Sequence, residues 1–321
     1  MKAIQVHAFG EPDVMQLLDI DIPTPGEEDV LVRIEAVGVN PVDTYIRAGN
    51  YPVLPQPPFI PGKDVGGEIV KVGEGVKKWK EGDRVYSSGT LTGAYAEYTL
   101  CHQSQVFSLP DNMDFAQGAA MGVPGAAAWR GLFTRARAIQ GDKLLVHGGS
   151  GSVGMIAIQL AVSAGLEVHG TAGTEQGLAK IRRAGATKAY NHRDPDYLVE
   201  IARDLGDSGY DIILEMLANI NLVNDLGLLG IRGRVVIIGS RGEITIDPRA
   251  TMAKETEILG MSLFNSSEEE MKEAQVGLYQ QMNAGRLAPE IAMTLPLRDA
   301  PQAHRRILES GNCGKIILLP R

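Results

Sequence analysis

The feature that most constrains the fold is a glycine-rich loop at residues 147–154, with the sequence HGGSGSVG, between a predicted strand and a predicted helix. Within this loop, Gly148, Gly151 and Gly154 are spaced three residues apart. Small residues let the backbone approach a pyrophosphate, and the free N–H groups and positive dipole of a helix N-terminus attract it. The loop therefore predicts dinucleotide binding, and the alternative interpretation is a tight structural turn.

Strands and helices alternate around this loop from about residue 124 onward. Strands are predicted at residues 143–147, 167–171, 189–191, 210–216 and 234–238. Helices are predicted between them at residues 153–164, 175–183, 197–205 and 222–229. Successive strand–helix units imply a parallel sheet, so this part of the chain is predicted to be a Rossmann domain with a doubly wound parallel sheet.

The two ends of the chain have a different character. Residues 1 to about 123 are rich in Val, Gly and Pro, with alternating runs such as that at residues 30–35, which predict a mainly-β domain. Residues 264–321 contain a Glu-rich helical stretch, 268 to about 285, and end in an apolar strand at 315–319. At 321 residues the chain has about twice the usual length of a domain, so an α/β protein with two domains is expected.

Composition argues against several classes of protein. The net charge is -8, from 31 Lys and Arg against 39 Asp and Glu, which argues against a nucleic-acid or anionic-membrane surface. The two cysteines, Cys101 and Cys313, cannot supply a disulfide framework or a four-thiolate zinc site, so a cytoplasmic location is expected. The uncharged stretch at residues 144–166 contains polar side chains and glycines, so it is not expected to span a membrane.

The residues after the second predicted strand bear on the choice of nicotinamide cofactor. An acidic residue there would bind the ribose diol of NADH. Residues 170–174 are instead Gly-Thr-Ala-Gly-Thr, which carry no carboxylate and leave room for a 2′-phosphate. NADPH is therefore the favoured cofactor, and the alternative is that Glu175 turns back to the ribose.

Six motifs over nearly the whole chain point to one family. They are GVNPVDTY at 38–45, PGKDVGG at 61–67, GDRV at 82–85, GAYAEY at 93–98, the glycine-rich loop, and EMLAN at 215–219. With these motifs the chain resembles the zeta-crystallin-type quinone oxidoreductases of the zinc-free medium-chain dehydrogenase/reductase superfamily. The resemblance implies a GroES-like catalytic domain from residues 1–123 and 264–321, and a Rossmann NADPH-binding domain from residues 124–263.

The resemblance also bears on metal binding. In zinc-containing relatives a Cys and a His-Glu pair bind the catalytic metal, whereas Asn40 here occupies the place of that Cys and Lys63-Asp64 the place of His-Glu. Zinc needs three or four converging N, S or O ligands, so no metal is expected. The six histidines lack ligand spacing, and His147 is expected to be structural or on the surface.

Site residues carried over from the family fall into two groups. The expected cofactor contacts are Tyr45, Ser150, Gly151, Ser152, Val153, Gly154, Gly173, Thr174, His192, Asn221, Ile238, Gly239, Ser240 and Arg241. The candidate catalytic residues are Asn40 and Tyr45, which are implied to face the nicotinamide and the acceptor, with Tyr51 as a neighbour. The alternative for Tyr45 is a packed aromatic ring with a solvated hydroxyl.

Two departures from the family affect this transfer. Several relatives have a Lys where this chain has Gly177, so an NADPH preference must rest on His192, Arg193 and nearby hydroxyls. Residues 122–129 are also smaller than in relatives, which predicts a wider acceptor pocket.

The expected absence of a metal bears on the type of reaction. Without a metal to stabilise alkoxide-like charge, a simple alcohol dehydrogenase reaction is not expected, whereas quinones delocalise the incoming electrons themselves. NADPH-dependent, zinc-independent reduction of a quinone is therefore predicted. The alternatives are a 2-alkenal or enone reductase and a non-catalytic, crystallin-like NADPH-binding protein. A homo-oligomer, either a dimer or a tetramer, is also expected.

Overall fold

The computed structural model describes residues 1–206 and 208–321 and contains two compact units. One consists of Met1–Pro124 and Ala288–Arg321, and the other of Gly125–Leu287. The sequence patterns divided the chain after residue 263, whereas the second unit extends to Leu287. The difference arises because helix α9 (Glu268–Asn283) belongs to the second unit, where its Glu270 carboxylate pairs with Arg130 at 3.1 Å.

The second unit is built on a six-stranded parallel sheet with the order β10-β9-β8-β11-β12-β13. The strands are β8 (Lys143–Val146), β9 (Glu167–Ala172), β10 (Lys188–Asn191), β11 (Tyr210–Glu215), β12 (Leu229–Ile237) and β13 (Glu257–Gly260). The helices are α3 (Gly122–Trp129, which begins in the first unit), a π-helix (Arg130–Arg135), α4 (Ser152–Ser163), α5 (Glu175–Arg183), α6 (Tyr197–Leu205), α7 (Ala218–Leu228), α8 (Arg249–Met252), α9 and the 3₁₀ turn Leu263–Asn265.

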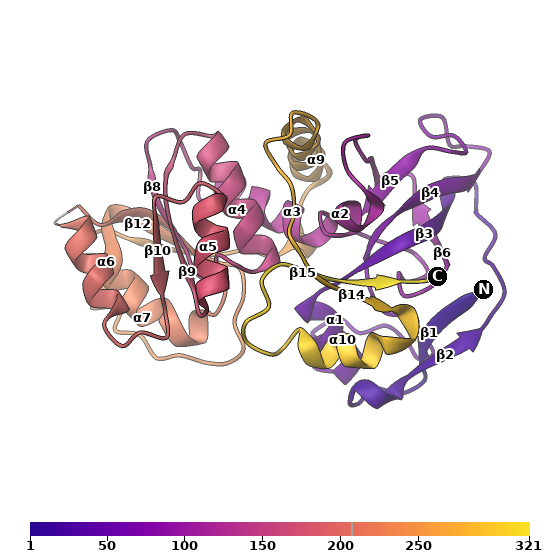
Figure 1. The fold of residues 1–321 in the computed structure, drawn as a ribbon, viewed down its shortest axis with the longest axis horizontal. Coiled ribbons are helices and arrows are strands. Elements are labelled where there is room, and N and C mark those ends of the chain that lie inside the picture. Colours follow the sequence, from indigo (N-terminus) through magenta and orange to yellow (C-terminus); the bar gives the residue numbers. More distant parts are fainter. Residues whose placement is uncertain (207) are drawn as a thin grey trace. The chain divides into compact units, whose positions relative to one another are not determined.

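This arrangement confirms the predicted doubly wound Rossmann architecture. Helices cover both faces of the sheet, with α4 and α5 on one face and α6 and α7 on the other (Figure 1). The strand order reverses between β8 and β11, and ligands of such sheets bind at the carboxyl ends of the strands on either side of this point. The five predicted strands are present, and β13 at the sheet edge is an additional one that the sequence patterns missed.

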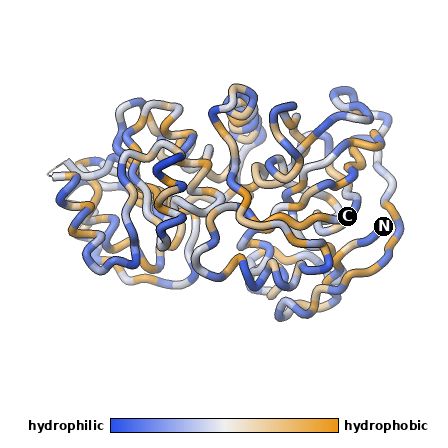
Figure 2. Tube along the Cα trace, in the orientation of Figure 1, coloured by the Kyte–Doolittle hydropathy of each residue, from blue (hydrophilic) through white to orange (hydrophobic). Residues whose placement is uncertain are grey.

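Apolar side chains of strands and helices form the core of this unit. Leu145, Ile213 and Val235 from three neighbouring strands pack with Leu222 and Leu226 of α7, and all five are buried. Figure 2 shows how hydrophobic and hydrophilic residues are distributed along the chain trace. Burial of this apolar surface is what holds α7, and with it the residues at its N-terminus, against the sheet.

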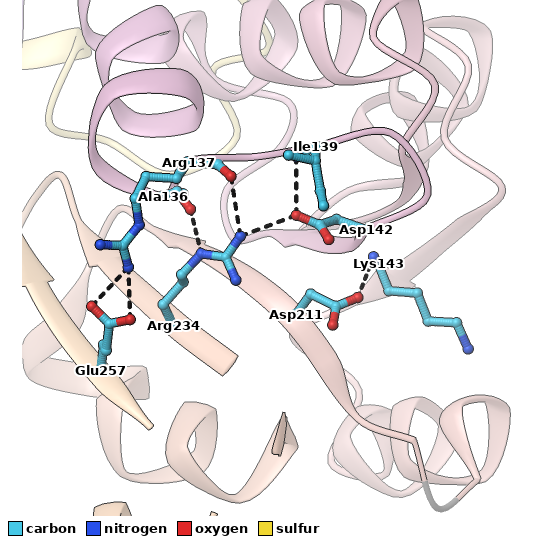
Figure 3. A network of polar contacts seen from close by, with 8 residues as sticks. All are labelled: Ala136, Arg137, Ile139, Asp142, Lys143, Asp211, Arg234 and Glu257. Carbon is cyan, nitrogen blue, oxygen red and sulfur yellow. Dashed lines mark hydrogen bonds and ion pairs between the residues drawn. The ribbon is translucent and has the colours of Figure 1, made fainter. Parts of the chain in front are cut away.

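A polar network fixes the amino ends of the strands, at the opposite edge from the glycine-rich loop (Figure 3). The Arg234 guanidinium donates to the carbonyl of Ala136 and pairs with Asp142 at 3.1 Å. The N–H of Lys143, the first residue of β8, donates to Asp211 Oδ2 at 2.8 Å. These contacts fix where β8 begins relative to its neighbours, and therefore where it ends at the loop.

The first unit is mainly β. Its main sheet has the order β14-β15-β3-β4-β5-β7, with β6 also paired to β3, and β1 and β2 form a separate pair. The strands are β1 (Lys2–Val6), β2 (Met15–Asp19), β3 (Asp29–Val39), β4 (Asp64–Val72), β5 (Arg84–Ser87), β6 (Tyr98–His102), β7 (Val106–Ser108), β14 (Ile291–Pro296) and β15 (Lys315–Leu319). The helices are α1 (Pro41–Ala48), α2 (Phe115–Ala119), α10 (Ala300–Arg306) and the 3₁₀ turns Pro12–Val14 and Leu297–Asp299.

Both ends of the chain contribute to this sheet. Strand β15 pairs antiparallel with β3, with Ile316 opposite Val39 and Leu318 opposite Val37. Figure 1 shows the yellow C-terminal strands beside the indigo β3. This pairing brings the start of β15 next to the end of β3 and the residues that follow it.

Over the described part of the chain, no helix combines the length and apolarity that crossing a bilayer requires.

Candidate functional site

The glycine-rich loop connects β8 to α4 at the point where the strand order reverses. Gly151 is the N-cap residue of α4, and Gly154 is buried in its first turn. An added Cβ at Gly154 would lie 2.5 Å from the Gly148 carbonyl oxygen, which no real side chain tolerates. The N–H of Gly148 donates to Thr171 Oγ1 at 3.1 Å, so the loop is also tied to β9. A close-packed loop at a helix N-terminus fits the pyrophosphate of a dinucleotide.

Residues predicted to bind the 2′-phosphate lie together at the carboxyl ends of β9 and β10. An added Cβ at Gly173 would lie 2.7 Å from His192 Nε2 and 3.0 Å from Arg193 Nε. Thr174 is the N-cap residue of α5, and its Oγ1 accepts the Gly177 N–H at 3.1 Å. One imidazole and one guanidinium therefore border the second helix N-terminus, where a phosphate would be favoured.

The electrostatic setting of His192 decides how it would bind a phosphate. Burial lowers the pKa of His192, and the positive charges of His147 and Arg193 lower it further. Its imidazole is therefore neutral at pH 7 and offers one N–H donor, while Arg193 carries the positive charge.

The predicted residues after β11 and β12 also lie close to one another. Asn221 Nδ2, in α7, donates to Glu215 Oε1 at 3.2 Å. The N–H of Ile238 donates to the Glu215 carbonyl at 2.9 Å. The N–H of Arg241 donates to Asn219 Oδ1 at 2.9 Å, so Asn219 holds the loop that the motif analysis assigned to the cofactor groove.

A buried ionisable cluster beneath this edge was not predicted. His147 Nε2 hydrogen-bonds Asp225 Oδ1 at 2.9 Å and lies 3.8 Å from Glu215 Oε2, and all three side chains are buried. Within residues 1–206 and 208–321, neither Glu215 Oε2 nor Asp225 Oδ2 has a hydrogen-bond partner. His147 is thus structural, one of the two roles expected for it. Its link to the acids went unseen because they lie in β11 and α7, far along the chain.

Burial and charge oppose one another within this cluster. Burial raises the pKa of Glu215 to about 7, opposed by the charge of His147 and reinforced by Asp225. Burial disfavours the charged form of His147, but its hydrogen bond to Asp225 and the two acidic charges outweigh this and raise its pKa. Among the described residues, these three are the group with metal-ligand atoms close together, within 4.8 Å. The imidazole nitrogen between the acids is occupied by its hydrogen bond to Asp225.

The first unit holds the candidate catalytic residues. Asn40, only 3% exposed, precedes α1, and its Nδ2 donates to Asp64 Oδ2 at 2.8 Å. Its Oδ1 accepts a hydrogen bond from Lys315 Nζ at 2.6 Å, and Lys315 also pairs with Asp64 at 2.9 Å. The family resemblance placed Lys63 where zinc-containing relatives have the histidine ligand. The ammonium that contacts Asn40 and Asp64 belongs to Lys315, from the other end of the chain.

The two candidate tyrosines of this unit are half-buried. Tyr45 lies on α1, five residues after Asn40, and Tyr51 follows the end of that helix. Burial raises the pKa of Tyr51. Their contacts with cofactor and acceptor stay a prediction.

A second buried acid lies at the N-terminus of α1. Asp43 Oδ2 accepts the backbone N–H of Asn40 at 2.9 Å and the Tyr95 hydroxyl at 3.2 Å. Burial raises the pKa of Asp43 to about 7, and nearby Asp64 contributes. Asp43 therefore holds the backbone of Asn40 in place while titrating near neutral pH.

This titration predicts a measurable pH dependence of stability. The folded-state pKa of Asp43 lies above its unfolded value, so its contribution is fully present at low pH and is lost as the pH rises through about 7. Between pH 6 and 8 we expect a loss of about 1.4 kcal/mol in the free energy of unfolding, measured by urea denaturation. Asp43→Asn keeps the acceptor oxygen but does not titrate, so it should remove this part of the loss. The partly exposed Asp83→Asn should not, and an unchanged slope in Asp43→Asn would contradict the assignment.

Family models, a sequence relative and solved structures of known proteins all resemble this chain. Two family models match: "Alcohol dehydrogenase GroES-like domain" over residues 26–111 and "Zinc-binding dehydrogenase" over residues 152–277. The quinone oxidoreductase of Homo sapiens is 46% identical over 321 residues, covering 99% of this chain and 98% of the relative. The structure of Escherichia coli quinone oxidoreductase complexed with NADPH has a TM-score of 0.89 at 29% identity and covers both chains fully. An NAD-dependent alcohol dehydrogenase structure has a TM-score of 0.93 at 26% identity, again over both full chains.

Proposed function

Because the chain belongs to the quinone oxidoreductases of the medium-chain dehydrogenase/reductase superfamily, we propose that it reduces quinones with NADPH, without a metal ion. The observation that carries this proposal is the donor set at Asn40. An amide and a carboxylate hydrogen-bonded to a lysine ammonium stand where zinc relatives have metal ligands. Neither an amide nitrogen nor an ammonium is a zinc ligand. The site is therefore suited to acceptors that stabilise added electrons themselves.

The second unit would hold the cofactor. The loop from Ser150 to Gly154 would bind its pyrophosphate, and Thr174, His192 and Arg193 its 2′-phosphate. Asn221 and residues 238–241 would line the rest of the groove. When bound, NADPH supplies the hydride. The protein's own contribution is to hold the reactants in contact, which is worth several kcal/mol in well-oriented reactions.

Asn40, Tyr45 and Tyr51 would orient the acceptor. The direct test is NADPH consumption by the purified protein against a panel of ortho-quinones, para-quinones and enones. Rapid turnover of quinones supports the proposal, and faster turnover of enones would favour the 2-alkenal reductase alternative. A protein that binds NADPH but turns over none of these acceptors would favour the non-catalytic alternative.

Cofactor preference provides a further prediction. NADPH should bind more tightly than NADH, because Gly173 and Thr174, which directly follow β9, are not acidic and His192 lies beside Gly173 with Arg193. His192→Ala should narrow this difference by roughly tenfold, since it removes one hydrogen bond to a charged group. Fluorescence titration with both cofactors measures it, with the exposed His7→Ala as control. A preference for NADH would contradict this cofactor assignment.

The role of Tyr45 can be tested through its hydroxyl. We expect Tyr45 to orient the acceptor, because a reduced quinone can take its protons from water. Tyr45→Phe should therefore lower kcat with a quinone by less than tenfold, or ~1.4 kcal/mol. A general acid typically contributes 10²–10⁴-fold. A loss of a hundredfold at saturating NADPH would identify Tyr45 as a proton donor and favour the enone reductase alternative.

The proposal also includes the oligomeric state and the cellular location of the protein. A homo-oligomer, a dimer or a tetramer, is supported by large apolar side chains exposed on the second unit, including Ile231, Met252 and Phe264. Light scattering after size-exclusion chromatography measures this state. A cytoplasmic location is supported by Cys101 and Cys313, which are both buried and not joined in a disulfide.

A further inference from the structure

Lys315 is a lysine buried in the core of the first unit. It is 1% exposed, and its ammonium contacts Asn40 Oδ1 and Asp64 Oδ2. An added Cβ at Gly38 would lie 2.6 Å from Lys315 Cε, so the neighbouring strand has no side chain where the lysine passes. Burying an ammonium is costly, and a buried ion pair seldom stabilises a fold more than apolar residues would. Stability alone therefore does not account for a lysine at this position.

The contacts of Lys315 determine the orientation of one amide. A lysine ammonium can only donate hydrogen bonds, and an ionised aspartate can only accept them. With Lys315 at Oδ1 and Asp64 at Nδ2, rotating the Asn40 amide by 180° would place donor against donor and acceptor against acceptor. Asp64 is itself fixed, because its Oδ1 accepts the Val123 N–H at 2.8 Å. Only one orientation of the Asn40 amide is therefore favourable.

This orientation leaves one donor of Asn40 available. The Nδ2 group has two N–H bonds, and one of them donates to Asp64. No described residue accepts the second, although Asn40 is only 3% exposed. Buried donors are normally paired, so an unpaired one beside candidate catalytic residues is suited to a ligand.

We propose that Lys315 is a positioning residue, which together with Asp64 locks the Asn40 amide so that its free N–H is offered to a quinone oxygen. This inference rests on the proposed function, because it takes Asn40 as a residue of the acceptor site. Negative charge develops on that oxygen during reduction, and a preoriented donor stabilises such charge without reorganisation. Lys315 acts through Asn40 and does not itself contact the acceptor.

The test compares a single and a double variant. Lys315→Met removes the ammonium, and we expect kcat with a quinone to fall at least tenfold while the Kd for NADPH stays within twofold. Its midpoint of urea denaturation should fall, because Asp64 is left buried without a counter-charge. Lys315→Met/Asp64→Asn should recover the midpoint but not kcat, because an asparagine at position 64 that keeps its oxygen on the Val123 N–H turns its NH₂ group toward Asn40 and favours the opposite orientation of the Asn40 amide. Lys2→Met, which breaks the exposed pair of Lys2 and Asp19, is the control and should change neither quantity.

A readout that needs no turnover separates this inference from the proposed function. With ¹⁵N-labelled asparagine, the side-chain NH₂ of Asn40 should give two resolved signals in the wild type, assigned by their loss in Asn40→Ala. Rotation about the amide C–N bond is slow, so two signals remain in every variant, but in the double variant they should shift and exchange faster with solvent. If the double variant recovers both stability and kcat, or leaves the Asn40 signals unchanged, Lys315 only balances the charge of Asp64 and the proposal is wrong. If the wild type turns over no quinone, the proposed function fails and these signals alone decide the orientation of Asn40.

Discussion

Gly154→Ala should weaken NADPH binding at least a hundredfold. The added methyl group would lie 2.5 Å from the Gly148 carbonyl oxygen and 2.7 Å from Gly149 Cα. Both contacts are with backbone atoms, so the loop would have to move away from α4. Gly148 and Gly149 also donate to Thr171, so this movement would break hydrogen bonds that fix the loop. Fluorescence titration with NADPH measures the loss.

A matched variant separates this effect from a general change in a helix. Gly227 lies in α7 of the same unit, and an added Cβ there would have no neighbour within 4 Å. Gly227→Ala should leave the Kd unchanged and stabilise the protein by up to about 1 kcal/mol, because alanine favours helix. Wild-type affinity in Gly154→Ala would show that the loop does not form the pyrophosphate site.

His147→Leu should lower the free energy of unfolding of the second unit by about 3–5 kcal/mol at pH 8, the typical cost of breaking a buried ion pair. Without the imidazole, Glu215 and Asp225 remain buried with no counter-charge. The pKa of Glu215, already about 7, should then rise further. A raised folded-state pKa stabilises at low pH, and this holds for His147 in the wild type as well as for Glu215 in the variant, so the cost is compared at pH 8 alone.

Urea denaturation followed by a probe in the second unit measures this effect. Two titratable groups near the cluster are His192 and Tyr197. Burial lowers the pKa of His192 and raises that of Tyr197, and the charges of the cluster add to both shifts. His169→Leu is the control, because His169 is also buried but contacts the Tyr210 hydroxyl and the partly exposed Glu167. Its cost at pH 8 should be smaller, because no buried acid loses its counter-charge. An equal cost of His147→Leu and His169→Leu at pH 8 would rule out the charge mechanism.

The sequence predicts well what depends on neighbouring residues. The glycine spacing and the strand–helix alternation are local patterns, and the structure contains the strands that they predict. Gly173, Thr174 and His192 were expected from the family resemblance, and in the structure they lie at one edge of the sheet, while their contact with the cofactor stays a prediction. Strand β13 was missed because it has only four residues, none of them fully buried, so it carries no alternation of exposure. Short strands at the edge of a sheet show little hydrophobic periodicity in the sequence.

Contacts between distant residues could not be predicted in this way. Lys315 was taken as the first residue of an apolar strand, and nothing in its neighbours indicates that its charge is paired with Asp64, 251 positions away. Asp225 lies in the helix predicted at residues 222–229, and no neighbouring residue indicates that it binds His147, 78 positions earlier. Both are buried charges, whose partners are set by tertiary packing rather than by propensity or periodicity.

The pairing of β15 with β3 has a consequence for the order in which the protein is made. The second unit is one continuous segment, so a ribosome has delivered all of it once Leu287 has emerged. The first unit begins earlier but cannot complete its sheet until residues 315–319 have been synthesised and can pair with β3. Until then Asn40 and Asp64 lack their ammonium partner. The nucleotide-binding half can therefore mature on the ribosome first, whereas the half that holds Asn40 is assembled only after residues 315–319 have been synthesised.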